Sequence, residues 1–275
     1  MCFPSTAPRA LARCAMLCRH STDTAEAEIT NTPKIRSEFR RRGIYLLPNL
    51  FTTAALFAGF YAIVQAMNQR FEHAAVAIFV AMVLDGLDGR VARLTRTQSA
   101  FGAEYDSLSD MVSFGAAPAL VMYEWALTSF GRLGWIVAFV YCAGAALRLA
   151  RFNTNIEIVD KRYFQGLPSP AAAALCAGFV WVVDDFGIDR AEVIRGLALV
   201  ITLFAGVSMV TNVSFYSFKD FNLRRSVPFW AVLAIVFALV LVSTNPPTIL
   251  FLLFVAYGLS GYVLWVLKRF RKVPK

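Results

Sequence analysis

The chain has 275 residues, of which 58% are hydrophobic and only 16% are charged, and its mean hydropathy is +0.57. A soluble domain is about half apolar and about a quarter charged, so this composition excludes an ordinary water-facing surface and points to lipid. The net charge is +9, and the basic residues lie between and beside the apolar runs. This arrangement indicates that they set the orientation of membrane spans, and it argues against a nucleic-acid-binding protein.

The N-terminal 43 residues lack a long apolar run and end in the basic stretch Arg40 to Arg42. Ser, Thr, Pro and mixed charge are frequent, and Arg13 interrupts a mildly apolar segment. We therefore expect residues 1–43 to form a disordered cytoplasmic tail rather than a signal peptide.

Eight apolar segments follow the tail, and they approach the roughly 20 residues that a helix needs to cross a membrane. Because a segment in lipid must satisfy its own backbone hydrogen bonds, we expect each of them to be a helix. The expected spans are 45–67, 71–94, 106–128, 132–152, 169–185, 192–213, 228–244 and 247–267. This pattern predicts an all-α, polytopic membrane helix bundle.

The basic residues predict how these spans are oriented. If both termini are cytoplasmic, the only basic residues on the opposite, non-cytoplasmic side of the membrane are Arg70, Arg132, Arg190 and Arg195. The inside segments are much richer in Lys and Arg, as the positive-inside rule requires. An even number of spans preserves this asymmetry, and an odd number would break it.

Four aspartates stand near the inner ends of the second and third spans. Asp85 and Asp88 are three residues apart, and Asp106 and Asp110 are four apart, so each pair lies on one face of its helix. The short connection 95–105 makes the two helices antiparallel neighbours, so the four carboxylates should converge. All-oxygen ligands suit a hard divalent ion such as Mg²⁺, Mn²⁺ or Ca²⁺. Two such ions could clamp the attacking and leaving oxygens of a phosphoryl displacement.

Small residues accompany the acids and favour the same interpretation. Gly89, Ala92 and Gly102 allow a ligand or a helix to approach the backbone closely. Arg93 lies one turn from Asp88 and could meet a diphosphate. The alternative is that the aspartates are solvated charges at helix ends, paired with nearby arginines. The regular spacing of all four, with glycines between them, argues for a functional site.

These residues make the chain resemble the CDP-alcohol phosphotransferases, whose signature is D-x-x-D-G-x-x-A-R, eight residues, then G-x-x-x-D-x-x-x-D. All its fixed positions are filled, by Asp85, Asp88, Gly89, Ala92, Arg93, Gly102, Asp106 and Asp110. Within the family the chain is most similar to the CDP-diacylglycerol–serine O-phosphatidyltransferases, or phosphatidylserine synthases. That narrower resemblance is carried by the stretches 47–52, 113–118, 148–153 and 164–170.

The resemblance implies a role for each motif residue. Asp85, Asp88 and Asp106 would ligate two divalent metals, Mg²⁺ or Mn²⁺. Asp110 would ligate a metal and also accept the proton. Gly89, Arg93 and Ser99 would contact the CDP headgroup, and the segment from Asn49 to Thr52 would close over the nucleotide.

The resemblance also implies the reaction and the domain organisation. The phosphatidyl group of CDP-diacylglycerol would pass to the hydroxyl of L-serine, giving phosphatidylserine and CMP. Residues 44–226 would form a catalytic core of six transmembrane helices, and 227–275 would add two more and a basic cytoplasmic C-terminus. The site would face the cytoplasm at a bacterial inner membrane. Family members are often homodimers, which leaves a homodimer open for this chain.

Residues that would recognise the acceptor are expected at the inner end of the fourth span. Arg148 and Arg151 end that span and Asn153 follows, and arginine suits bidentate contacts to a carboxylate. The alternative is that both arginines only follow the positive-inside tendency. Lys219 and Arg225, after the sixth span, are weaker candidates.

Two other functions stay open at this point. The first is the same chemistry with another alcohol, such as glycerol 3-phosphate or an inositol phosphate, which should need a denser basic pocket. The second is a cation transporter that uses the carboxylates as its ion site. The position of the acids near the inner surface, rather than at the middle of the spans, argues against the transporter.

Overall fold

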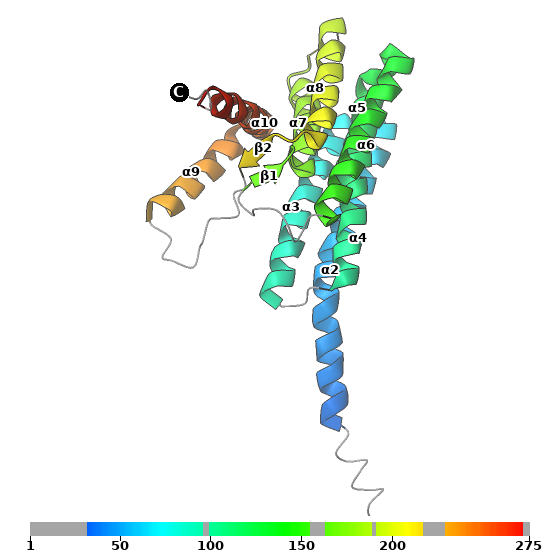
Figure 1. The fold of residues 1–275 in the computed structure, drawn as a ribbon. Coiled ribbons are helices and arrows are strands. Elements are labelled where there is room, and N and C mark those ends of the chain that lie inside the picture. Colours follow the sequence, from blue (N-terminus) through cyan, green and yellow to red (C-terminus); the bar gives the residue numbers. More distant parts are fainter. Residues whose placement is uncertain (1–31, 96–98, 155–162, 189–190, 217–228, 272–275) are drawn as a thin grey trace, which may run out of the picture. The chain divides into compact units, whose positions relative to one another are not determined.

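The computed structural model describes residues 32–95, 99–154, 163–188, 191–216 and 229–271 (Figure 1). The helices are α2 (Thr32–Met67), α3 (Phe71–Thr95), α4 (Ala100–Asp110), α5 (Ala117–Trp125), α6 (Arg132–Thr154), α7 (Ser169–Asp185), α8 (Glu192–Val210), α9 (Phe229–Thr244) and α10 (Pro246–Arg271). A π-helical segment, η1 (Met111–Ala116), joins α4 to α5, and a 3₁₀ turn, η2 (Leu127–Phe130), follows α5. Each of the eight predicted spans coincides with a helical segment, so the predicted all-α membrane bundle is confirmed.

A short β-ribbon accompanies the helices and was not predicted. Strands β1 (Tyr163–Gln165) and β2 (Ser214–Tyr216) pair antiparallel, with Phe164 opposite Phe215. The strands follow α6 and α8, which end on the same side of the bundle. Three-residue strands between long helices leave almost no alternating pattern from which to predict them.

The helix α2 begins much earlier than the predicted first span. The chain divides into a first unit, Met1–Leu47, and a second unit, Pro48–Lys275. In the first unit, residues 32–47 are helical, whereas a disordered tail was expected through residue 43. Pro33 stands in the first turn, where its missing N–H is harmless, and the Arg, Lys and Glu residues that follow are good helix formers. Residues 1–31 of the expected tail lie outside the described residues.

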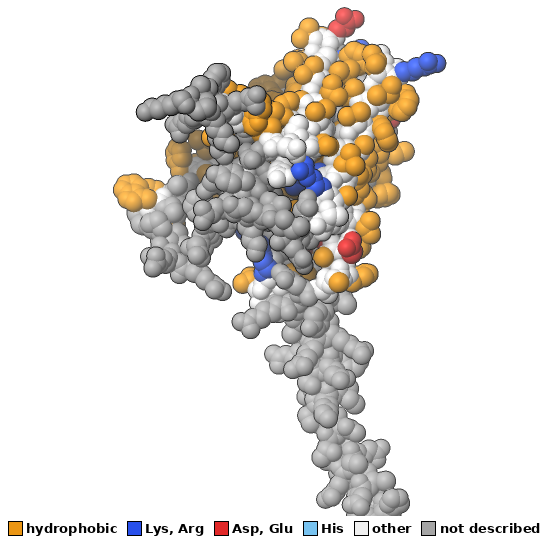
Figure 2. All heavy atoms as spheres, in the orientation of Figure 1, with side chains coloured by type: hydrophobic (Ala, Val, Ile, Leu, Met, Phe, Trp, Pro, Cys, Tyr) orange, Lys and Arg blue, Asp and Glu red, His pale blue; other side chains and the backbone are white. Residues whose placement is uncertain are grey.

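The second unit has the surface of a membrane protein. Four of its described segments are long and apolar enough to cross a bilayer, namely Pro48–Met67, Arg132–Thr154, Glu192–Val210 and Pro246–Leu267. Large hydrophobic side chains cover the sides of α6 and α8 (Figure 2), and Phe139 and Leu147 remain 63% and 59% exposed. Water would penalise such contiguous apolar surface, and lipid would not. The protein is therefore an integral membrane protein.

The interior of this unit is built from small residues. Every residue of α7 from Ala171 to Val180 is buried, and this helix packs against α3, α8 and α10. Helices α6 and α8 touch through glycines, because a Cβ atom on Gly144 would lie only 2.5 Å from the carbonyl oxygen of Gly206. Such small-residue contacts let helix backbones approach closely where lipid provides no hydrophobic driving force.

Candidate active site

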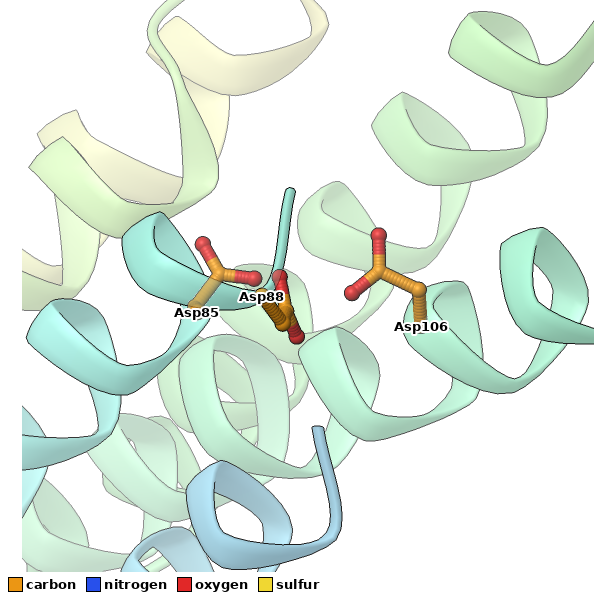
Figure 3. Close-up of side chains that lie close together, drawn as sticks. All are labelled: Asp85, Asp88 and Asp106. Atoms are coloured by element: carbon orange, nitrogen blue, oxygen red, sulfur yellow. The ribbon is translucent and has the colours of Figure 1, made fainter. Parts of the chain in front are cut away.

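Three aspartates from two helices meet at one point. Asp85, Asp88 and Asp106 each bring a carboxylate oxygen to within 4.8 Å of the other two. Figure 3 shows Asp85 and Asp88 on α3 facing Asp106 on α4. The spacings of three and four residues place the two acids of each helix on one face of that helix. Asp88 is only 5% exposed, so part of this charge is removed from solvent.

The fourth aspartate, Asp110, lies at the side of this cluster. It is the last residue of α4, its carboxyl group lies within hydrogen-bonding reach of Asp85, and it is in electrostatic range of Asp106. Carboxylates this close repel one another unless a proton or a cation lies between them. The structure thus brings the four predicted aspartates together, with Asp110 outside the group of three closest acids.

The donor set suits a divalent cation. Oδ1 of Asp106 is buried and has no hydrogen-bond partner among the described residues. An unpaired buried carboxylate oxygen is costly, and a metal ion would satisfy it. Three convergent carboxylates are also the ligand type that Mg²⁺ and Mn²⁺ prefer. The residues present therefore fit such an ion.

The first turns of the apolar segment Pro48–Met67 of α2 support the cluster directly. The Thr52 hydroxyl donates to Oδ2 of Asp88 at 2.8 Å, with the carbonyl of Pro48 as a second acceptor at 3.2 Å. The hydroxyl of Ser109 on α4 donates to the Thr52 carbonyl oxygen at 3.1 Å. Thr52 therefore links α2 both to the acids of α3 and to the helix that carries Asp106.

The π-helical segment η1 begins immediately after Asp110. Pro118 has no N–H, so the carbonyl of Phe114, four residues earlier, lacks its ordinary α-helical donor. The buried hydroxyl of Tyr141 donates to this carbonyl instead, at 3.0 Å. The Ser113 hydroxyl donates to the carbonyl of Ala55 at 3.1 Å, which holds this segment against the first span. Such π-segments are frequent at functional sites, and this one was missed although Pro118 signalled a break in the helical hydrogen bonds.

The residues expected to contact CDP lie around the cluster. A Cβ atom on Gly89 would meet nothing within 4 Å among the described residues, so this backbone is open to a ligand. The Nε atom of Arg93 donates to the Gly89 carbonyl at 2.9 Å. Ser99 is the N-cap of α4 and accepts from the backbone N–H of Gly102 at 3.0 Å. The Oδ1 atom of Asn49 lies 3.4 Å from where a Cβ atom on Gly102 would stand.

The three acceptor candidates on α6 have different surroundings. Arg148 donates to the Ser169 hydroxyl at 2.6 Å and lies in electrostatic range of Asp110. Arg151 donates to Oε1 of Gln165 at 2.5 Å. The side-chain amide of Asn153 donates to the hydroxyl of Ser107 at 3.0 Å. Arg148 thus interacts electrostatically with one of the acids, and Asn153 is bonded to the helix that carries Asp106 and Asp110. The weaker candidates, Lys219 and Arg225, lie outside the described residues.

An apolar groove of about 570 Å³ opens between α2 and α3. At one end it is lined by Ala54 and Leu84, which are close in sequence to Thr52 and Asp85. Phe57 and Val80 line its middle, and its lining extends to His73 near the start of α3. From Leu84 back to His73 the helix rises about 1.5 Å per residue, so the groove runs on the order of 16 Å away from the acids.

The CDP-alcohol phosphatidyltransferase family model matches residues 45–213. The CDP-diacylglycerol–serine O-phosphatidyltransferase of Helicobacter pylori is 37% identical over 225 residues, covering 81% of this chain and 92% of the relative. The enzyme of that name from Mycobacterium tuberculosis is 40% identical over 154 residues, which are 54% of each chain. The one from Saccharomyces cerevisiae is 36% identical over 171 residues, covering 54% of this chain and 61% of the relative. The matched segment contains the four aspartates and ends before β2, α9 and α10.

Proposed function

The chain belongs to the CDP-alcohol phosphatidyltransferase family, and on that basis we propose that it transfers the phosphatidyl group of CDP-diacylglycerol to L-serine. The products are phosphatidylserine and CMP. The observation that carries this assignment is the 37% identity to the Helicobacter pylori enzyme over 92% of that enzyme's length. The convergence of Asp85, Asp88 and Asp106 supports the phosphoryl-transfer chemistry independently.

The acidic cluster is the proposed metal site. Asp85, Asp88 and Asp106 hold the metal, with Asp110 as a further ligand beside Asp85. Two divalent ions, Mg²⁺ or Mn²⁺, would neutralise the diphosphate and stabilise charge on the transferring phosphoryl group. The unpaired Oδ1 of Asp106 supports this role for the cluster. Thr52 orients Asp88 through its hydrogen bond of 2.8 Å.

Asp110 is the proposed general base. A serine hydroxyl is a poor nucleophile at neutral pH, so a positioned carboxylate lowers the barrier by taking its proton. The hydroxyl oxygen forms a bond to the lipid-side phosphorus, the bond from that phosphorus to the CMP oxygen breaks, and Asp110 keeps the proton. The electrostatic interaction of Arg148 with Asp110 supports a role for this guanidinium beside the acceptor. It would bind the serine carboxylate, with Arg151 and Asn153 further out on the same helix.

The nucleotide of the substrate would lie over the start of α4 and the open backbone of α3. Gly89 leaves room for it, and Arg93 and Ser99 offer donors to its phosphates and sugar. Asn49 lies beside Gly102 and would close this side together with Thr52.

The groove between α2 and α3 would take an acyl chain of the same substrate. Its inner end adjoins Asp85 through Leu84, where the diphosphate would be held. Its lining is apolar along most of its length, which suits a hydrocarbon chain rather than the headgroup. A lipid bound with its diphosphate at the acids could thus leave its tail in the groove without crossing the bundle.

The basic residues support an orientation with both termini and the site on the cytoplasmic side of a bacterial inner membrane. Residues 44–226 would form the catalytic core, and 227–275 would add the last two helices. A homodimer remains a prediction.

The experiment is an assay of CMP release by the purified protein in detergent, with CDP-diacylglycerol and each acceptor in turn. L-serine should support the fastest release in Mn²⁺ or Mg²⁺, and chelation should abolish it. Faster release with glycerol 3-phosphate or an inositol phosphate would reassign the acceptor. If no acceptor supports metal-dependent CMP release, the proposed transferase function is refuted and a cation transporter is favoured instead.

A further inference from the structure

Helix α4 carries two of the four aspartates, yet it contributes no residue to the buried apolar core. Of its 11 residues only Ser109 is buried. Its large apolar side chains, Phe101 and Leu108, are 70% and 67% exposed. A helix is usually held in place by an apolar face that packs on the core. Because α4 lacks such a face, the orientation of its acids depends on polar contacts with neighbouring helices.

Two of these polar contacts join α4 to α2. The Ser109 hydroxyl donates to the carbonyl oxygen of Thr52 at 3.1 Å. The Tyr105 hydroxyl shares a hydrogen bond of 2.9 Å with the hydroxyl of Thr53. Tyr105 and Ser109 are four residues apart and therefore lie on the same face of α4. Both bonds thus hold one side of the helix.

The contact on another side comes from Asn153, near the end of α6. Its side-chain amide donates to the Ser107 hydroxyl at 3.0 Å, in a partly buried position. The hydroxyl can donate in turn to the Ala103 carbonyl of its own helix at 3.1 Å, with Oδ1 of Asn153 as an alternative acceptor at 3.3 Å. This pair therefore ties α4 to α6 through side chains alone.

The acids of α4 lie between the residues that make these bonds. An α-helix turns by about 100° per residue. Counted around the axis from Tyr105, Ser109 lies at about 40° and Ser107 at about 200°. Asp106 and Asp110 fall between them, at about 100° and about 140°. The bonds to α2 and to α6 thus hold the helix on both sides of its acidic face, and together they set its rotation.

We propose that Asn153 is a positioning residue for the metal-binding face of α4, instead of the acceptor contact that the sequence suggested. Its bond to Ser107 opposes the bonds to α2 and keeps the acids of α4 turned toward those of α3 (Figure 3). Without this bond the helix is held from one side only, and its acids are less firmly oriented. Partners that orient metal ligands increase metal affinity. The inference rests on the proposed function, because it takes the acidic cluster as the metal site.

The test is Asn153→Leu, which keeps the size of the side chain and removes both polar groups. Mn²⁺ binding is measured without substrate, from the decrease in the electron paramagnetic resonance signal of the free ion. The dissociation constant for Mn²⁺ should rise about three- to tenfold, as expected for the loss of one neutral hydrogen bond. Ser107→Ala should give a similar rise. The double variant should show no further rise, because each change removes the same bond.

Activity separates this role from acceptor binding. At saturating Mn²⁺, the KM for L-serine in Asn153→Leu should stay within twofold of the wild type, while the Mn²⁺ concentration for half-maximal CMP release rises with the dissociation constant. The matched control is Thr154→Val, because the hydroxyl of this neighbouring residue bonds the Arg151 carbonyl of its own helix. Its Mn²⁺ affinity should equal that of the wild type.

An unchanged Mn²⁺ dissociation constant in Asn153→Leu would overturn the inference, with or without a raised KM for serine. An equal loss of Mn²⁺ affinity in Thr154→Val would overturn it too, as would a wild type that binds no Mn²⁺. If the wild type binds Mn²⁺ but releases no CMP, the proposed function fails, and the Mn²⁺ dissociation constants of the variants still decide the role of Asn153.

Discussion

The hydrogen bond from Thr52 to Asp88 allows a test of the proposed metal site that leaves every acidic ligand in place. Replacing Thr52 by Val keeps the shape of the side chain and removes the hydroxyl that donates to Oδ2 of Asp88 at 2.8 Å. Thr52 is only 4% exposed, so water cannot easily take over its role. The variant should fold as the wild type does, with a carboxylate that is less firmly oriented.

The expected magnitude follows from the kind of bond lost. A hydrogen bond to a charged group contributes about 1.5 to 3 kcal/mol, or roughly 10- to 100-fold in an equilibrium constant. Loss of a partner that orients a metal ligand typically costs about 10- to 100-fold in metal affinity. We therefore expect the Mn²⁺ concentration for half-maximal CMP release to rise at least about tenfold in Thr52→Val.

The assay is a Mn²⁺ titration of CMP release at saturating CDP-diacylglycerol and serine. Thr52→Ser retains the hydroxyl and should restore the midpoint to within about threefold of the wild type. Thr53→Val is the matched control, because the neighbouring Thr53 bonds the Asn49 carbonyl and the Tyr105 hydroxyl and contacts no aspartate in these bonds. A Thr52→Val midpoint within twofold of the wild type would refute the reasoning that Thr52 orients a metal ligand.

Other expected outcomes concern the base, the nucleotide face, the helix contacts and the groove. Asp110→Asn should lower kcat at least about 100-fold while CDP-diacylglycerol still binds, and retained turnover would remove Asp110 as the base. Gly89→Ala should leave the melting temperature unchanged, because its Cβ atom meets no described residue, yet raise the KM for the CDP-lipid. Gly206→Ala should cost about 1 to 3 kcal/mol in unfolding free energy, because its Cβ atom would lie 2.8 Å from Cα of Tyr141; an unchanged melting temperature would contradict the close α6–α8 contact. Val80→Phe, in the groove, should slow turnover of a dioleoyl substrate more than that of a dioctanoyl one, and equal slowing would place the acyl chain elsewhere.

The sequence alone determined the class of the fold and the place of the acids. Apolar runs in a bilayer can only be helices, so the helical segments at all eight predicted positions were predictable, four of which are long and apolar enough to cross a bilayer. The spacing of Asp85, Asp88, Asp106 and Asp110 was sufficient to place each pair on one helix face, because helical periodicity is a local property. The boundaries were less predictable, since residues 32–43 extend α2 where a tail was expected.

The tertiary structure decided the contacts between helices that are distant in sequence. No local pattern shows that Thr52 bonds Asp88, that Tyr141 bonds the Phe114 carbonyl, or that Arg148 bonds Ser169. Each of these depends on the rotation and depth at which two helices pack, and these are set by glycine contacts and aromatic packing across the whole bundle. Local periodicity therefore predicts which face of a helix carries the chemistry, and only packing decides which neighbour meets that face.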